Sequence, residues 1–262
     1  AAFSPSASAT GPKGLAAAVQ HGGKELSFNN YLDLDGALRI ARGFLIDTDE
    51  KRPHGCVVIK HTNPCGAAID ATQVGAWENA LASDPESAFG CVIAFTHTVE
   101  KATAEAIGGH FLECIIAPGY DDDALEILSE KQNRRMLTLD DFTPREDEVR
   151  IRQLDGGWVA QVQGPPSVDW SAVKCVTKAP ADEDLVALAR FGSTVLSEVK
   201  SNSIVLVAQT ETGFATVGVG PGQTSRVEAV RIAARRAGER AQGSMMVSDA
   251  FFPFRDGIDT AH

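Results

Sequence analysis

Short apolar runs and helix-periodic stretches alternate along the first half of the chain. Runs such as GCVVIKH and CVIAF are apolar at almost every position, which is typical of strands buried on both faces of a sheet. We expect strands at 55–61, 91–95 and 114–118, and helices at 31–45, 74–82, 101–107 and 122–130. Alternation of this kind predicts α/β layers around a largely parallel sheet.

The second half repeats this rhythm after a charged, proline-containing stretch at 140–150 and a boundary near GPPSVDW at 164–170. Here the pattern predicts strands at 173–178, 203–209 and 214–220, and helices over 181–200 and from Ser225 onward. Residues rich in Ala, Ser, Pro and Gly open the chain and indicate a linker. The predicted division is a linker-like start at 1–14, a first unit at 15–163 and a second α/β unit at 164–262.

The composition of the chain argues against several classes of protein. The formal net charge of −11 over 262 residues argues against nonspecific nucleic-acid binding, which needs a basic surface. Five cysteines with no CxxC spacing indicate buried free thiols in a reducing cytoplasm. No apolar run is long enough for a membrane helix, and the first residues do not resemble a signal peptide. The chain lacks an initiator Met, so it is either processed or part of a longer protein.

The first candidate site is KHTNPCG at 60–66, at the end of a predicted strand. Residues Lys60 and His61 would point to opposite faces of a regular strand, but a turn formed by Asn-Pro-Cys-Gly could bring both to one pocket. An adjacent cation and imidazole suit acid–base catalysis. The alternative is a surface lysine beside a structural histidine. A zinc deaminase site is excluded, because Asn63 and Ala68 replace its Glu and second Cys.

The second candidate is the glycine-rich loop GVGPGQTSR at 218–226, between a predicted strand and a predicted helix. Free amides at a helix N-terminus favour an anion, and Ser225 with Glu228 has capping-box spacing. A cation at Arg226 opposes the helix dipole, which often marks a functional position. Neither the Walker A nor the GxGxxG pattern is present, so turn and anion site remain equal alternatives.

The third candidate is SDAFFPFRD at 248–256, where aromatic rings and carboxylates could bind a flat heterocycle. The alternative is a core segment followed by a surface turn. On pattern alone, Asn202 in KSNS is a turn residue.

Taken together, the segments resemble one family. They are ELSFNNYLDLDGAL, IKHTNPCG, DPESAFG, IIAPGYDDDAL, KSNSIVL, VGVGPGQTSRVEAVRIA and SDAFFPFRDGID. In this order they are similar to AICAR transformylase, the C-terminal portion of a bifunctional purine enzyme that also carries IMP cyclohydrolase. The resemblance implies formyl transfer from 10-formyltetrahydrofolate to the 5-amino group of 5-aminoimidazole-4-carboxamide ribonucleotide (AICAR). It also implies tandem cytidine-deaminase-like three-layer α/β/α units without zinc, and a homodimer with active sites at the subunit interface.

The resemblance also assigns residues. Its catalytic positions fall on Lys60, His61 and Asn202. Its nucleotide contacts fall on Phe89, Gly90, Glu113, Asn202, Arg226 and Phe251, and its folate contacts on Val227, Phe254 and Asp256. No metal is implied. The family's RYGxNPHQ and QPGGS-like segments are not in this chain, which keeps a truncated, non-catalytic binding protein as the alternative. The formyl donor could be the folate, or formate with ATP.

Overall fold

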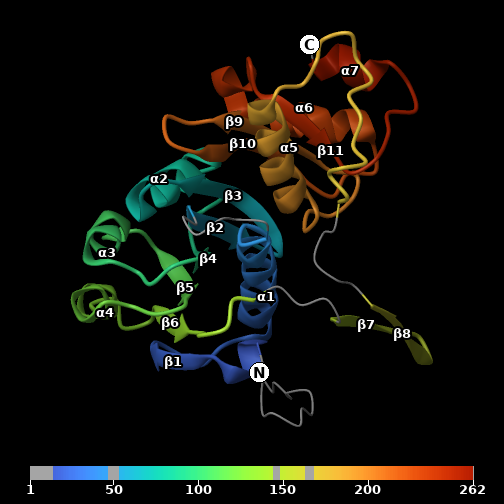
Figure 1. Ribbon diagram of the computed structural model, residues 1–262. Helices are drawn as coiled ribbons and strands as arrows, with labels where there is room; N and C mark the ends of the chain where they lie inside the picture. Colours follow the sequence, from blue (N-terminus) through green and yellow to red (C-terminus); the bar gives the residue numbers. More distant parts are fainter. Residues whose placement is uncertain (1–13, 47–52, 144–147, 163–167, 262) are drawn as a thin grey trace.

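The computed structural model describes residues 14–46, 53–143, 148–162 and 168–261, and its main feature is one nine-stranded sheet (Figure 1). The strand order is β1-β6-β5-β4-β2-β3-β10-β9-β11. In chain order these strands are β1 (Val19–Gly22), β2 (His54–Lys60), β3 (Asn63–Asp70), β4 (Cys91–Phe95), β5 (Leu112–Ala117), β6 (Arg135–Thr138), β9 (Ile204–Gln209), β10 (Phe214–Gly220) and β11 (Met245–Ser248).

The prediction of a largely parallel sheet is wrong. Only the β4–β5 and β5–β6 pairs are parallel, and the other neighbouring pairs are antiparallel. Parallel pairing needs a long crossover, which the helices α3 (Lys101–Ile107) and α4 (Asp122–Ser129) supply before and after β5 in the chain. Tight hairpins instead join β2 to β3 and β9 to β10. Pairing of β3 with β10 makes the sheet continuous across the two predicted units. The division at 163/164 stays a prediction.

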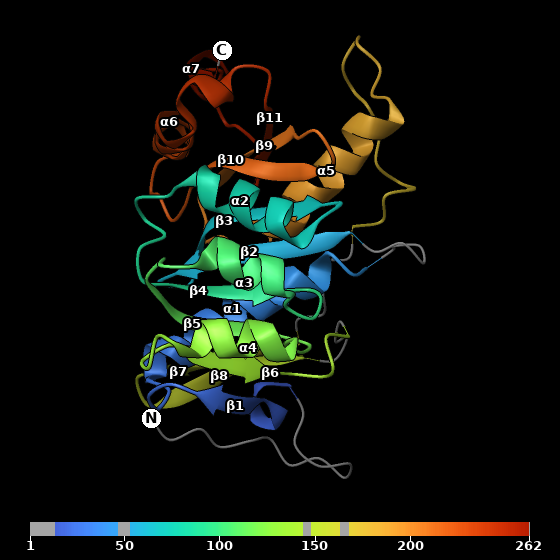
Figure 2. The same cartoon turned by 90° about the vertical axis from the view of Figure 1, so that its left-hand side faces the viewer.

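Helices cover both faces of the sheet, which gives three layers (Figures 1 and 2). One face packs against α1 (Phe28–Gly43) and α5 (Glu183–Leu196). The other packs against α2 (Gln73–Ser83), α3 (Lys101–Ile107), α4 (Asp122–Ser129) and α6 (Arg226–Ala237). Strand β2 is apolar at successive positions because Val57 and Ile59 face the first layer while Cys56 and Val58 face the second. Four of the five cysteines are buried as expected, and Cys175 is exposed.

Two local predictions are wrong. The predicted turn at Asn-Pro-Cys-Gly is the start of β3, because the chain reverses one step earlier, at His61 and Thr62. The predicted strand at 173–178 is an irregular surface segment with Val176 93% exposed. Its valines favour extended backbone, but no neighbouring strand within the described part of the chain pairs with it.

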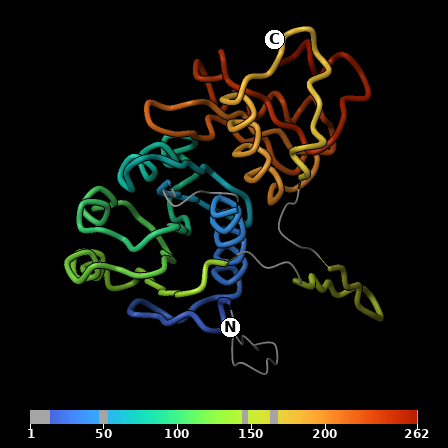
Figure 3. The backbone as a smooth tube through the Cα atoms, viewed as in Figure 1, coloured from blue at the N-terminus to red at the C-terminus, as the bar shows by residue number. Residues whose placement is uncertain are grey.

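The remaining elements lie at the edges of this body. A separate hairpin of β7 (Val149–Leu154) and β8 (Gly157–Val162) extends away from the sheet (Figures 1 and 3). The short helix α7 (Asp256–Ala261) packs near α6, and two 3-10 turns occupy Gly14–Ala17 and Gly238–Ala241. Among the helices in the described ranges, none has the length and apolar character needed to cross a membrane.

Candidate active site

The turn between β2 and β3 presents the Lys60–His61 pair. Both His61 and Thr62 have positive φ values, 54° and 63°, in a two-residue turn of the kind that fits the twist of paired strands. The turn is fixed from α1, because the Thr62 amide donates a hydrogen bond of 2.6 Å to Asp33 Oδ1. Lys60 Nζ donates to the Phe89 carbonyl at 2.7 Å, while His61 is exposed. The Lys60 ammonium is therefore held by the Phe89 carbonyl, whereas the His61 side chain is exposed beside it in sequence.

Both side chains line one cavity of about 330 Å³, which confirms that they reach a common pocket, although the turn that achieves this is not the predicted one. The second half of the chain contributes Pro221, from the loop after β10, and Arg236, from α6. Arg236 Nε lies 3.2 Å from Asp84 Oδ2. The full lining is Lys60, His61, Asn63, Pro64, Cys65, Ser87, Pro221 and Arg236. Burial raises the pKa of Cys65 to about 12, so this thiol stays protonated at neutral pH and is no nucleophile.

The glycine-rich loop is bonded to the segment that carries Asn202. The Asn202 and Gln223 backbones exchange two hydrogen bonds of 3.0 Å, and the Gly222 amide donates to the Lys200 carbonyl at 2.7 Å. The Asn202 side-chain amide adds bonds to the carbonyls of Gln223 and Thr224. The Ser225 side chain accepts from the Glu228 amide, which confirms the predicted helix cap. These contacts use loop amides that an anion would need and bring Asn202 next to the loop that lines the His61 cavity.

The Arg226 side chain turns inward and binds Asp249, at the end of β11. Its Nη1 also donates to the Ser203 carbonyl at 3.0 Å, and the Ser203 amide donates to Asp249 Oδ1 at 2.8 Å. Burial raises the pKa of Asp249, but hydrogen bonds from Ser201, Arg226 and Ser203 outweigh it and hold that pKa below its ordinary value. Asp249 is therefore an ionised partner that neutralises Arg226, and pattern analysis alone did not identify this pairing.

The depressed pKa of Asp249 should make this cluster acid-sensitive. Its stabilising contribution is present above the unfolded pKa of about 3.9 and is lost as the pH falls through the lower folded value. We expect the free energy of unfolding of the unaltered protein to fall more steeply below about pH 5 than that of Asp249→Asn. Urea unfolding from pH 7 to pH 3 measures this, and parallel curves for the two proteins would contradict the assignment.

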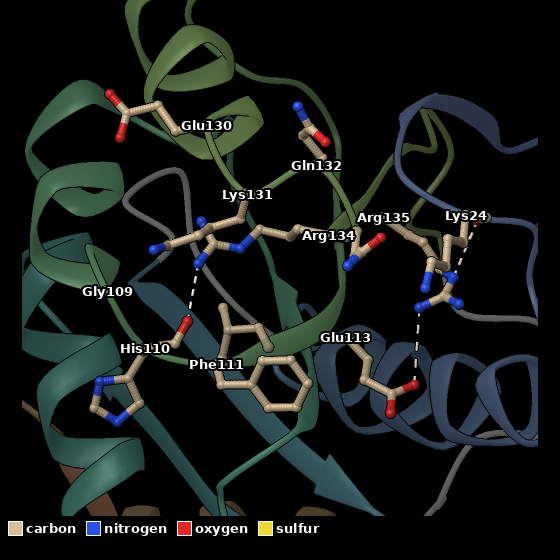
Figure 4. A pocket seen from close by; sticks show the side chains of 12 residues that line it. Lys24, Gly109, His110, Phe111, Glu113, Glu130, Lys131, Gln132, Arg134 and Arg135 are labelled. Atoms are coloured by element: carbon tan, nitrogen blue, oxygen red, sulfur yellow. Dashed lines mark hydrogen bonds and ion pairs between the residues drawn. The ribbon is translucent and has the colours of Figure 1, made fainter.

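A second, larger pocket of about 600 Å³ lies where β5 and β6 begin (Figure 4). Four cations, Lys24, Lys131, Arg134 and Arg135, and two acids, Glu113 and Glu130, are among its lining residues. The guanidinium of Arg134 is buried and bound to backbone carbonyls, His110 at 2.9 Å among them. This pocket, here called the basic pocket, therefore has more cations than acids in its lining, although the chain as a whole has a net charge of −11. Sequence analysis missed this pocket, although the run EKQNRR at 130–135 was its signal.

Three of the predicted nucleotide contacts, Glu113, Phe89 and Gly90, lie in or beside the second pocket. Glu113 accepts a hydrogen bond from Asn30 at 2.7 Å and lies 3.8 Å from the Arg135 guanidinium in the second pocket. Phe89, whose carbonyl binds Lys60, has its ring centroid 5.0 Å from that of Phe111, which lines the second pocket. The Gly90 amide donates to the Phe111 carbonyl at 2.9 Å. Phe89 thus contacts Lys60 through its carbonyl and Phe111 of the second pocket through its ring, and Gly90 bonds to Phe111 as well.

The other predicted contacts lie on the surface near α6 and α7. Phe251 and Phe254 are 80% and 73% exposed, Val227 lies in the first turn of α6, and Asp256 begins α7. None of these four lines either of the two pockets described above. Within the described residues, no group of three or more His, Cys, Asp or Glu side chains is placed to hold a metal ion.

Comparison with known proteins gives the family. The family described as "AICARFT/IMPCHase bienzyme" matches residues 1–236. Similar proteins include the "Bifunctional purine biosynthesis protein PurH" of Dinoroseobacter shibae, 43% identical over 259 residues, covering 95% of this chain and 47% of the relative. That of Desulfitobacterium hafniense is 41% identical over 262 residues, covering 100% and 48%. That of Thermosynechococcus vestitus is 42% identical over 250 residues, covering 95% and 46%.

The chain belongs to the AICARFT/IMPCHase bienzyme family. It spans about half the length of the curated relatives it matches. These relatives are named as bifunctional proteins of purine biosynthesis.

Proposed function

We propose that this chain carries the transformylase reaction, the transfer of a formyl group from 10-formyltetrahydrofolate to the 5-amino group of AICAR. The observation that carries the proposal is the joint presence of Lys60 and His61 in one cavity, which is also lined by Pro221 from the loop that binds Asn202. An imidazole and an ammonium from residues that line one cavity suit proton removal from an amine and stabilisation of the oxyanion that forms.

The chemistry proceeds by addition and elimination. The 5-amino nitrogen attacks the formyl carbon while His61 accepts the amine proton, which gives a tetrahedral oxyanion. Lys60 stabilises this oxyanion with its positive charge. Collapse of the intermediate breaks the bond from carbon to N10 of the folate, and N10 takes up a proton as tetrahydrofolate leaves. Asn202 already donates through its side-chain amide, so its Oδ1 serves as an acceptor for the carboxamide of the nucleotide.

In this proposal the nucleotide spans the two pockets. We place its phosphate in the basic pocket with Lys24, Lys131 and Arg135, because the charge of Arg226 is already neutralised by Asp249. The ribose then passes Glu113, Phe89 and Gly90, and the base reaches the Lys60–His61 turn. Arg226, predicted as a nucleotide contact, acts in this proposal by fixing the segment around Asn202 beside α6.

The folate is assigned to the surface of α6 and α7. Phe254, with Phe251 nearby in sequence, offers an exposed ring for a flat pterin, while Val227 adds apolar surface and Asp256 a carboxylate for ring N–H groups. Rings that are more than two-thirds exposed need further cover, which a second copy of the chain would supply in the proposed homodimer.

The experiment that tests this function is a donor comparison. The protein is incubated with AICAR and either 10-formyltetrahydrofolate or formate with ATP, and formylated product is measured. The proposal expects turnover with the folate. Turnover only with formate and ATP would show that the formyl donor is not the folate. Binding of AICAR without any turnover would support the non-catalytic alternative instead.

The phosphate assignment has its own test. We expect Lys131→Ala to raise the KM for AICAR about tenfold, the loss of one charge-assisted contact, and to leave the KM for the folate unchanged. The matched comparison is Arg226→Ala, assayed with AICAR and with its unphosphorylated riboside. If Arg226 only positions Asn202, both substrates should weaken alike. A loss confined to the phosphorylated substrate would make Arg226 the phosphate ligand and contradict this placement.

A further inference from the structure

Two arginines at the end of α6 reach the carboxyl end of α2. Arg236, in the last turn of α6, has its Nε 3.2 Å from Oδ2 of Asp84, the residue that follows α2. Arg240, in the 3-10 turn after α6, donates hydrogen bonds of 2.6 and 3.2 Å to the carbonyls of the last two residues of α2. Cations are favoured at this end of a helix because its dipole is negative there. Of the two arginines, Arg236 lines the cavity of the Lys60–His61 turn and Arg240 does not.

The carboxylate that pairs with Arg236 is largely buried, since the Asp84 side chain is 12% exposed. Asp84 also fixes the segment 84–89 that follows α2. Its Oδ1 accepts a hydrogen bond from the Ser87 amide at 3.1 Å, and its carbonyl accepts one from the Ala88 amide at 3.1 Å. The position of this segment therefore depends on Arg236, because without that charge a buried carboxylate would be left unpaired.

Arg236 joins this segment to the second half of the chain. The segment ends at Phe89, whose carbonyl holds the Lys60 ammonium at 2.7 Å. On its other side, Arg236 donates from Nη1 to the Val219 carbonyl at 2.8 Å, near the end of β10. The glycine-rich loop that follows β10 exchanges backbone hydrogen bonds with Asn202. One guanidinium thus binds both the segment that holds the lysine and the strand that leads to the loop holding the asparagine.

We propose that Arg236 is a positioning residue for formyl transfer, which keeps Lys60 and Asn202 in register on the two sides of the His61 cavity. This inference rests on the proposed function, because the roles of the lysine and the asparagine are those given there. Arg236 acts through its two partners and not on the reacting atoms. A guanidinium suits this task because its donors lie in a rigid plane, so one side chain fixes the angle between a carboxylate and a carbonyl.

The expected result is a loss in kcat with little change in KM. Arg236→Met should lower kcat by about 100-fold, the order of the loss when a reacting group moves by about 1 Å. The KM for AICAR should rise by less than about threefold, because its phosphate is placed in the basic pocket and the lost alignment matters in the transition state. Arg236→Lys should lower kcat by only about tenfold, because lysine keeps the charge beside Asp84 but not the bond to Val219.

The matched control is Arg240→Met, which removes a cation from the same helix end without touching the cavity. Its urea midpoint should fall, because the α2 carbonyls lose their donors, while its kcat should stay within about twofold of the unaltered protein. Equal losses of kcat in Arg236→Met and Arg240→Met overturn the proposal, and so does a kcat of Arg236→Met within about threefold of the unaltered protein.

A double variant covers the case in which Arg236→Met fails to fold. Asp84→Asn together with Arg236→Met removes both charges, so no carboxylate is left buried alone and stability should return. If Arg236 only stabilised the fold, kcat would return with stability. The proposal expects kcat to remain about 100-fold low, because the lysine and asparagine segments are still uncoupled. Recovery of kcat in this folded variant overturns it.

Hydrogen exchange gives a readout that does not need turnover. Peptides over 86–90 and over 220–224 should both exchange about tenfold faster in the double variant, as expected for the loss of one charge-assisted contact, and Arg240→Met should change neither. Formyl transfer by the unaltered protein with unchanged exchange in either peptide of the double variant overturns the positioning role and leaves the proposed function intact. If the unaltered protein transfers no formyl group, the proposed function fails, and faster exchange in both peptides supports the coupling of the two segments alone.

Discussion

Replacing His61 by asparagine should reduce kcat for formyl transfer by about 10²- to 10⁴-fold, the usual contribution of a positioned general base. Asparagine is the informative substitution because His61 has a positive φ of 54°, a conformation that asparagine tolerates better than alanine. The change therefore removes the imidazole without straining the turn. Stopped-flow or steady-state assays with saturating substrates measure the loss, and circular dichroism checks the fold.

The control for this variant is Thr62→Asn, which changes the neighbouring position of the same turn and keeps the imidazole. Its backbone bond to Asp33 is retained, so activity should stay within about threefold of the unaltered protein, as for most substitutions that spare the reacting groups. If His61→Asn retained comparable activity, or if both variants lost activity equally, His61 would not be the base.

Replacing Gly66 by alanine should lower the free energy of unfolding by about 3 kcal/mol, the upper part of the range for overpacking. A Cβ at Gly66 would lie 1.9 Å from the Ala80 carbonyl oxygen and 2.7 Å from Ser83 Cβ, so β3 would have to move away from α2. The obstacle is helix backbone, which cannot turn aside as a side chain can. Since β3 begins at the turn that presents His61, catalysis should suffer with stability.

The matched control is Gly36→Ala in the interior of α1, where an added Cβ meets nothing within 4 Å. There alanine should raise the free energy of unfolding by about 0.5–1 kcal/mol, because glycine is the poorer helix former. Urea unfolding of both variants gives the comparison. If both substitutions changed the free energy of unfolding by similar amounts in the same direction, the close packing of β3 on α2 would not be what excludes a side chain at Gly66.

Where both faces of a strand are buried, the sequence was sufficient to predict it. The runs at β2, β4, β5 and β9 are apolar because each lies between helix layers, so composition alone marks them. Strand direction was not predictable in the same way, because it depends on whether a helix or a two-residue turn follows. The segment at 173–178 has strand-forming valines, yet strand formation also requires a neighbouring strand.

In the candidate site, too, features formed by neighbouring residues were predictable and features formed by distant residues were not. That Lys60 and His61 line one cavity was predictable because they are adjacent at the end of a strand, and their catalytic role stays a prediction. The pairing of Arg226 with Asp249 and the basic pocket were not, because their members are distant in the chain and meet only in the fold. The contact between β3 and β10 is of this kind too, since Ala67 and Thr216 hydrogen-bond across a sequence separation of 149.

The most direct test of the central claim is a structure of the whole protein with AICAR bound. The account predicts the 5-amino nitrogen within about 3.2 Å of a His61 ring nitrogen, hydrogen-bonding distance for a base, with the phosphate in the basic pocket near Lys131. A nucleotide bound elsewhere, or one whose amino group points away from the Lys60–His61 turn, would contradict it.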